Sequence, residues 1–386
     1  MIQTQNTAVL KSGFRLQRAT EKEFEALGEE WDKLLQESEH NSVFLTWEWM
    51  YTWWKVFGKG SELLVLLVHD GDHNLVGIAP LYVEQQTDHG FLPMRTIKFL
   101  GTNDASSEYL GFIIKREAEQ EVTNRLLQFL LFGEMHWDKL MFSDMLCSCN
   151  CTQLLYDVVM CFPGYLKVVD KWDYPLIKLP QKFSSYVDSL SKSLRRNLRY
   201  TTNKLNREFV CEFDQTFDVE EVRKIVAELF RLHELRCLRS RRNSSFISPE
   251  MRAFHMKISE TFFHKGWLRL YYIKLNQEIQ AVAYGFLYGK TLFGYQLGFN
   301  PEFISYSLGN NILLRTVEDS IQSECENYDF LRGSEKYKHR WTNSERQVVD
   351  VVVYASHTKG AACYFILQAR KRASRLYHRA KHLVGD

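Results

Sequence analysis

The sequence lacks any apolar run long enough to cross a membrane. A spanning helix needs about 18 or more apolar residues in succession, whereas the longest runs, such as Leu63 to Val68, have the length of a strand. The first 18 residues also lack the basic start, apolar stretch and small-residue cleavage site of a secretory signal. We therefore expect a cytoplasmic protein whose eight cysteines stay reduced.

A strong charge of either sign is also missing. The 49 Lys and Arg residues nearly balance 47 Asp and Glu residues, and the formal net charge is +2. This total does not indicate a nucleic-acid partner, so any basic surface must be local. Metal sites usually combine a Cys-x-x-Cys pair with a second ligand pair, and none accompanies Cys147, Cys149 and Cys151. These three cysteines are expected to be free thiols, with a metal site or a redox role as alternatives.

What the sequence does contain is material for two α/β domains. Its 386 residues exceed one ordinary core, and 45% are hydrophobic. Both halves show the order hairpin, strand, loop, helix, strand, although two generic α/β halves can resemble each other by chance. Pro175 and Pro180 punctuate the middle, so we expect domains at 1–180 and 181–386. The expected elements are strands at 63–68, 75–84, 95–100 and 137–142 with a helix at 117–132, then helices at 184–207 and 219–238, strands at 268–275, 279–288, 291–297 and 328–331 and a helix at 312–325.

The loop before the helix at 312–325 is a candidate anion site. It contains Ser307, Leu308, Gly309, Asn310 and Asn311. Unpaired backbone N–H groups and a partial positive charge at a helix start suit a pyrophosphate, and a glycine lets the backbone approach it. The alternative is a plain helix cap that binds nothing.

A second candidate is the polar segment that follows the strand at 328–331. Ligands gather beyond the carboxyl ends of strands in open α/β sheets. Tyr337 can protonate a departing thiolate, and Glu335 or Asp329 can accept a proton from an amine, directly or through water. Lys338 and Arg340 can hold a phosphate or an acidic substrate. Alternatively, this is a solvated polar loop above a packed Trp341.

Two helices carry further candidates. His233 can act as a base or orient a substrate, or it can be a satisfied structural histidine. Lys192, Arg195, Arg196 and Arg199 share one face of an amphipathic helix, which suits RNA, another anionic polymer or cofactor phosphates, or is simply solvated.

Two other segments have a functional and a structural interpretation. The stretch 370–381 has six basic residues and predicts a helix that packs on its domain or contacts anionic lipid at a membrane surface. Trp49 and Trp53 lie at helical spacing and predict either a core helix or the floor of a groove for a sugar or acyl group.

Taken in order, these motifs resemble the CelD-like, FemAB-related GNAT acetyltransferases, which are associated with cellulose or exopolysaccharide biosynthesis. The resemblance covers most of residues 40–355. The matching residues are Trp47-Glu48-Trp49 with Trp53-Trp54 and Phe57-Gly58, Ser193-Leu194-Arg195-Arg196-Asn197, His233 with Arg236, Tyr306-Ser307-Leu308-Gly309, Asp329-Phe330-Leu331-Arg332-Gly333, and Tyr337-Lys338 with Trp341.

The resemblance implies a tandem GNAT fold of the α/β class, with two mixed sheets flanked by helices. It implies an acyltransferase that moves an acyl group from acetyl-CoA or another acyl-CoA to an amine, which can be an amino sugar, a peptide or a small amine. In such a fold the strand at 291–297 separates from its parallel neighbour, and the amides of Gln296, Leu297 and Gly298 polarise the thioester carbonyl. An ordinary three-stranded meander is the alternative for this strand.

The sequence departs from the family at the phosphate loop. Family members often have Ser-Pro-Gly at the position of Ser307-Leu308-Gly309, and the superfamily pattern Gln/Arg-x-x-Gly-x-Gly/Ala is incomplete because Asn310 and Asn311 follow the glycine. FemAB relatives use aminoacyl-tRNA as donor, and the basic helix near Arg195 suits tRNA. Transfer from acyl-CoA is thus the main hypothesis. The alternatives are a FemAB-like aminoacyltransferase and a non-catalytic binding module that keeps the fold.

Overall fold

The computed structural model describes residues 13–383, apart from 89–91, 103–104, 162–164, 334 and 336. By packing, the chain divides into two units, of which the first is discontinuous in sequence. Unit 1 comprises Met1–Trp172 and Val348–Asp386, and unit 2 comprises Asp173–Gln347. The chain passes between the units within strands β7 (Tyr165–Lys178) and β13 (Ser344–Ala355). The division into domains at 1–180 and 181–386 stays a prediction.

The sheet of unit 1 has the strand order β1-β2-β3-β4-β6-β13. Neighbours are antiparallel except β4 and β6, which run parallel because helix α4 connects them. The short β5 pairs with β3. The strands are β1 (Arg15–Arg18), β2 (Glu62–His69), β3 (Leu75–Asp88), β4 (Leu92–Phe99), β5 (Ile113–Ile114) and β6 (Lys139–Leu146). The helices are α1 (Glu21–Ala26), α2 (Gly28–Glu37), η1 (Val43–Leu45), α3 (Trp47–Phe57), η2 (Arg116–Ala118), α4 (Glu119–Phe132), α5 (Asn150–Cys161) and α11 (Thr358–Leu383).

The aromatic run near the start of the chain forms helix α3 in the core of unit 1. Trp49 and Trp53 are 0% and 1% exposed. The indole N–H of Trp49 donates to the hydroxyl of Ser107 at 2.7 Å. The core interpretation of this run is therefore the one that the structure supports, since buried rings cannot floor an open groove.

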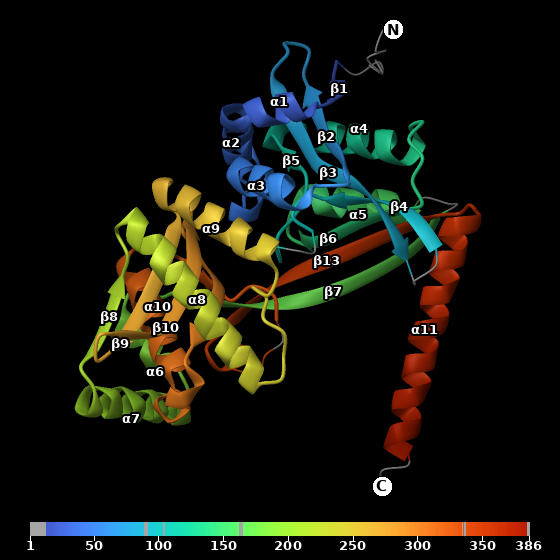
Figure 1. Ribbon diagram of the computed structural model, residues 1–386. Helices are drawn as coiled ribbons and strands as arrows, with labels where there is room; N and C mark the ends of the chain where they lie inside the picture. Colours follow the sequence, from blue (N-terminus) through green and yellow to red (C-terminus); the bar gives the residue numbers. More distant parts are fainter. Residues whose placement is uncertain are drawn as a thin grey trace. The chain divides into compact units, whose positions relative to one another are not determined.

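The sheet of unit 2 repeats the pattern, with the order β8-β9-β10-β11-β12-β7. Strands β8, β9, β10 and β7 are labelled in Figure 1. Here β11 and β12 are the parallel pair, and helix α10 connects them. The strands are β8 (Cys211–Gln215), β9 (Leu268–Leu275), β10 (Glu278–Tyr288), β11 (Thr291–Phe299) and β12 (Asn327–Asp329). The helices are α6 (Phe183–Ser189), α7 (Lys192–Glu208), α8 (Val219–Arg239), α9 (Pro249–His264), η3 (Pro301–Tyr306), α10 (Leu308–Gln322) and η4 (Lys338–Arg340).

Helices cover both faces of the unit 2 sheet. Along β9, Tyr271 and Ile273 belong to the apolar core that α6, α7 and α10 share. The intervening Tyr272 instead donates a hydrogen bond to Glu221 of α8 at 3.2 Å. Because successive side chains of a strand point to opposite faces, α8 lies on the face opposite α10. The mixed parallel and antiparallel pairing with flanking helices confirms the predicted α/β fold class.

Several boundaries differ from the expected ones. The single helix expected at 184–207 is two helices, because Leu190 is extended and the Ser191 hydroxyl caps α7 by accepting from the Leu194 amide at 3.3 Å. The expected basic C-terminal helix is the end of the longer α11, whose side chains after Arg372 lie outside the described residues. Nothing that the structure describes as a helix is both long and apolar enough to span a membrane.

Candidate functional site

The parallel strands β11 and β12 separate soon after they pair. Their pairing spans only Thr291–Phe293 with Asn327–Asp329, whereas β11 continues to Phe299 alongside β10. A β-bulge lies at the point of separation, since Tyr284 pairs with Gln296 and Gly285 with Gly294, which leaves Tyr295 as an extra residue. From Gly294 to Phe299 no strand among the described residues pairs with this edge of β11, which we call the open edge.

The predicted phosphate loop lies at the start of α10 and keeps two backbone amides unpaired. Ser307 adopts a left-handed conformation with φ 51° and ψ 45°. Its carbonyl accepts from the amides of Asn310 and Asn311 at 2.9 and 3.0 Å, and its own amide donates to the preceding 3-10 turn at 3.1 Å. No described group accepts from the amides of Leu308 and Gly309. The loop can therefore offer two N–H groups to an anion, fewer than the sequence predicted.

The side chain of Asn311 is already engaged within the protein. It is 6% exposed. Its amide group donates to the Tyr306 carbonyl at 2.9 Å and to the Thr201 hydroxyl at 3.2 Å, and its oxygen accepts from the Thr202 hydroxyl at 2.6 Å. Asn311 thus fastens the loop to α7. Only the backbone of Asn311 could therefore take the predicted part in donor binding. Its two threonine partners were not predicted from the sequence.

Gly309 packs against the open edge. A Cβ at this position would lie 3.2 Å from the Phe299 ring and 3.5 Å from the Leu297 side chain. The tertiary structure thereby brings the predicted phosphate loop and the predicted strand segment together. A larger side chain at Gly309 would have to displace the Phe299 ring or project over the two unpaired amides.

His233 faces β11 from helix α8 and is 3% exposed. Its Nδ1 lies 2.8 Å from the Ser244 hydroxyl and 3.7 Å from Sγ of Cys237, and its ring interacts with the Gln296 side chain. Gly298 leaves no room for a side chain here, because a Cβ would lie 3.0 Å from the His233 backbone nitrogen. Burial, helped by the charge of Arg236, lowers the pKa of His233 to about 4. The neutral ring is a weak base at physiological pH, and its catalytic role stays a prediction.

Tyr337 lies at the start of η4 and is 40% exposed. Burial, helped by the charge of Glu335 and opposed by the charge of Arg236, raises the pKa of Tyr337 to about 12. The phenol stays protonated at neutral pH and can donate a proton, while Glu335, with 45% of its side chain exposed, is accessible to a base role.

Asp329 is 0% exposed and fully engaged. Its Oδ1 accepts from the Leu331 amide at 2.9 Å, and its Oδ2 pairs with Arg346 at 3.0 Å. Such a carboxylate holds the end of β12 in place, because a buried charge needs partners. This geometry favours a structural role for Asp329. Its role as a base stays a prediction.

Lys338 is likewise 6% exposed. Its ammonium group donates to the carbonyls of Phe330 and Arg332 at 3.0 and 2.6 Å and lies 3.3 Å from the Glu335 carboxylate. It can therefore orient Glu335. Three donors engaged in this way leave little capacity for a phosphate, which was the role predicted for Lys338.

The predicted basic face of α7 is partly available. Arg195 pairs with Asp188 at 3.1 Å. Lys192, Arg196 and Arg199 are exposed, and no ion pair joins them to another described residue. This surface remains open to an anionic partner.

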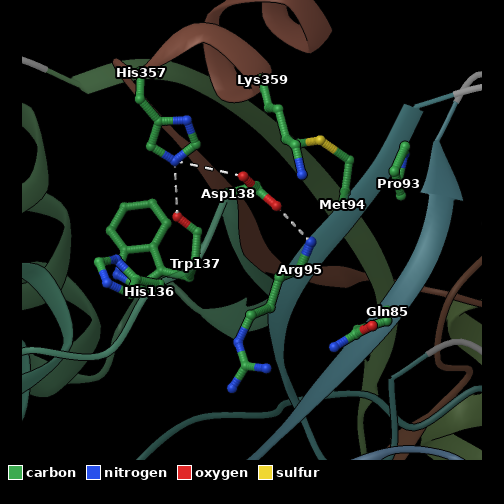
Figure 2. Close-up of a pocket in the computed structure, with 9 residues that line it drawn as sticks. All are labelled: Gln85, Pro93, Met94, Arg95, His136, Trp137, Asp138, His357 and Lys359. Atoms are coloured by element: carbon green, nitrogen blue, oxygen red, sulfur yellow. Dashed lines mark hydrogen bonds and ion pairs between the residues drawn. The ribbon is translucent and has the colours of Figure 1, made fainter.

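A separate hollow of about 320 Å³ lies in unit 1 and contains none of the predicted site residues (Figure 2). Its central carboxylate, Asp138, accepts from the Arg95 amide at 2.7 Å and lies 3.4 Å from Nε2 of His357. These contacts join the start of β4, the start of β6 and the start of α11. The lining residues are Gln85, Pro93, Met94, Arg95, His136, Trp137, Asp138, His357 and Lys359.

The model of a protein family described as an acetyltransferase (GNAT) domain matches residues 192–339. This range contains the predicted phosphate loop and the predicted catalytic residues. No curated protein sequence matches the chain. The narrower resemblance to CelD-like enzymes stays a prediction.

Comparison with solved structures gives the fold of the whole chain. FemX superposes with a TM-score of 0.58 at 11% identity and covers 88% of this chain and 97% of its own. A conserved protein of unknown function from Bacteroides thetaiotaomicron gives 0.50 at 9% identity, with 87% and 98% covered. A tandem GNAT protein from the clavulanic acid biosynthesis pathway gives 0.49 at 12% identity, with 89% and 99% covered. Residues 192–339 thus match the model of an acetyltransferase (GNAT) domain, and the chain as a whole shares its fold with FemX.

Proposed function

We propose that the protein transfers an acyl group from acetyl-CoA or another acyl-CoA to an amine, with the donor bound by unit 2. One observation carries this proposal: the open edge of β11 from Gly294 to Phe299 packs against a helix start with two unpaired amides. A linear donor with an amide-containing arm and a diphosphate needs both features side by side. The match of residues 192–339 to an acetyltransferase domain supports the same function.

In this proposal the diphosphate binds the amides of Leu308 and Gly309, and the amide arm of the donor pairs with the open edge. An extended ligand that adds to a strand edge gains main-chain hydrogen bonds that no side chain has to supply. The amides between Gln296 and Gly298 then lie at the position of the thioester carbonyl. There they stabilise the negative charge that develops on its oxygen.

The chemistry requires one proton acceptor and one proton donor. The acceptor amine loses a proton to Glu335, directly or through water, and attacks the thioester carbonyl. When the tetrahedral intermediate collapses, the carbon–sulfur bond breaks and Tyr337 protonates the departing thiolate. Much of the rate comes from alignment of the two reactants, so an imperfectly placed base is tolerated.

Arg236 indicates where the acceptor lies. Its positive charge lowers the pKa of both His233 and Tyr337. Its guanidinium carbon lies 5.8 Å from the centre of the Phe299 ring. It is half-buried, and no carboxylate pairs with it among the described residues. We infer that the amine acceptor carries a carboxylate or phosphate, as intermediates of polysaccharide or cell-envelope synthesis do.

Calorimetry with coenzyme A tests the donor site. The wild-type chain is expected to bind coenzyme A, and Gly309→Leu is expected to lose that binding because the side chain covers the two amides. The matched control is Gly71→Leu, in a turn of unit 1 where an added Cβ meets only one atom, at 3.8 Å. Intact affinity in folded Gly309→Leu contradicts the site, and equal loss in Gly71→Leu contradicts its location.

The exposed face of α7 favours a second candidate, an aminoacyltransferase that uses charged tRNA. Lys192, Arg196 and Arg199 would then contact phosphates, and binding would weaken steeply with salt. The double variant Arg196→Glu, Arg199→Glu is expected to abolish RNA binding, whereas Lys257→Glu on exposed α9 surface is not. Salt-independent or absent RNA binding by the wild type rules this candidate out.

A non-catalytic binding module is the remaining alternative. It predicts that coenzyme A or RNA binds but that no acyl-CoA is turned over with any amine. Release of free thiol from acetyl-CoA, measured across amino sugars, peptides and small amines, separates this alternative from an enzyme.

A further inference from the structure

The bulge on β11 is held by two histidines from two different helices. Tyr295, the extra residue of the bulge, places its hydroxyl 3.3 Å from Nε2 of His255 on α9. The side chain of the next residue, Gln296, interacts with His233 on α8. Consecutive residues at the start of the open edge are thus each tied to a histidine, and neither histidine belongs to a strand.

The two rings are buried and fixed in place. His255 is 1% exposed, and its Nδ1 lies 3.4 Å from the Tyr284 hydroxyl. The Phe246 ring lies between the histidines, with its centre 5.1 Å from His233 and 5.2 Å from His255 and its plane nearly perpendicular to each. Burial lowers the pKa of His255 to about 3, so both rings are neutral and act as hydrogen-bonding groups.

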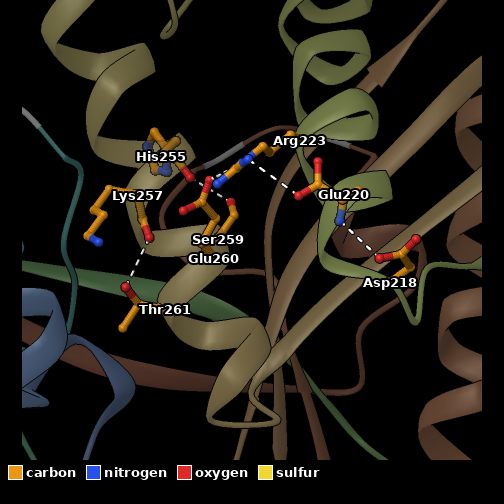
Figure 3. Close-up of polar contacts among 8 residues, drawn as sticks. All are labelled: Asp218, Glu220, Arg223, His255, Lys257, Ser259, Glu260 and Thr261. Carbon is orange, nitrogen blue, oxygen red and sulfur yellow. Dashed lines mark hydrogen bonds and ion pairs between the residues drawn. The ribbon is translucent and has the colours of Figure 1, made fainter.

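The helices that carry these histidines are themselves joined. Figure 3 shows Arg223 of α8 between two carboxylates, 2.5 Å from Glu260 of α9 and 3.5 Å from Glu220 of its own helix. On α9 the Ser259 hydroxyl donates to the His255 carbonyl at 2.6 Å. A fixed pair of helices therefore presents both histidines to the bulge.

We propose that His233 and His255 are positioning residues that hold the bulge at Tyr295 and Gln296 and thereby set the open edge for the acyl donor. The inference rests on the proposed function. Beyond Phe293 the strand has lost its hydrogen bonds to β12, so only β10 and these side chains fix its position. A bulge held from one face can present the amides of the open edge without a partner strand.

The variant Tyr295→Phe removes one hydroxyl and keeps the ring. One lost hydrogen bond of ordinary strength corresponds to about a 3- to 10-fold loss of affinity. We expect the KM for acetyl-CoA and the Kd of coenzyme A to rise by about this factor. Tyr271→Phe is the matched control, because it removes a tyrosine hydroxyl that donates to Asp319 from strand β9, which is not part of the open edge or of the bulge. Equal effects in both variants, or no effect in Tyr295→Phe, overturn the proposal.

His233→Gln separates positioning from base catalysis. Glutamine keeps hydrogen-bonding capacity but cannot take up a proton, so a positioning role predicts retained kcat with a raised KM for the donor. A fall in kcat of about 100-fold or more at unchanged KM identifies a base instead and overturns this role.

The proposed function can fail independently of the two-histidine clamp, by which we mean the contacts of His233 and His255 with Gln296 and Tyr295. If the wild type binds no coenzyme A, the donor site fails, while hydrogen exchange of the amides at 294–299 still tests the clamp. Faster exchange there in Tyr295→Phe than in Tyr271→Phe supports it, and equal exchange overturns it.

Discussion

Burial separates the titratable residues that follow β12 into two groups. Asp329 and Lys338 are 0% and 6% exposed. Asp329 pairs with Arg346, and Lys338 donates to nearby backbone carbonyls. Tyr337 is 40% exposed, and the Glu335 side chain, which pairs with Lys338, is 45% exposed. A group that must meet a reactant needs free surface, so Tyr337 and Glu335 are the better candidates for proton transfer.

Replacing Tyr337 by Phe tests this at the scale of one hydroxyl. We expect kcat for acetyl transfer to fall about 100-fold, since a general acid contributes roughly 10²- to 10⁴-fold, while the Kd of coenzyme A stays the same. Because the pKa of Tyr337 is raised to about 12, the wild-type rate should show no loss from its deprotonation up to about pH 10. A variant with wild-type kcat shows that another group, or water, protonates the thiolate.

At the scale of elements, helices α8 and α9 each place a buried histidine against the sheet of unit 2. His233 and His255 are both buried with pKa values lowered to about 4 and about 3 from 6.5. Buried neutral imidazoles suit a static hydrogen-bonding role, because they do not change charge at physiological pH. Their lowered pKa values also make the stability of the folded state depend on pH.

That coupling gives a measurable pH dependence. Both histidines are neutral in the folded state, and the unfolded chain takes up a proton at each below pH 6.5, so unfolding becomes easier as the pH falls from 6.5 toward 4. Each contributes a slope of about 1.4 kcal/mol per pH unit in that window. Urea unfolding at pH 7, 6 and 5 should show a shallower decline for His255→Phe than for the wild type. Parallel declines in the two proteins indicate that His255 is accessible to protons in the folded state.

At the scale of the whole molecule, unit 1 depends on the two ends of the chain. Strand β13 pairs with β6 through Val348–Tyr354, more than two hundred residues away in sequence. Cys363 of α11 then packs with Met94 and Tyr354 in a small core. The last segment of the chain is therefore part of the fold of unit 1.

Truncation tests this dependence. A chain that ends at Gln347 should lose the cooperative unfolding of unit 1, because β6 loses its pairing with β13 and the core around Cys363 disappears. A chain that ends at Arg370 keeps these contacts and should unfold like the full chain. Scanning calorimetry distinguishes the two, and a cooperative transition of unit 1 in the shorter chain contradicts the packing described here.

Local pattern alone determined much of this protein. Alternating and helical periodicity together with turns such as Asp70-Gly71-Asp72 located most strands of both sheets, and the helix-start chemistry around Gly309 located the loop, because these signals depend on neighbouring residues. Only the tertiary structure decided that β11 leaves β12 after Phe293, that Asp329 is paired with Arg346, and that residues after 347 complete unit 1. Each of these depends on contacts between residues far apart in the chain, which no local periodicity encodes.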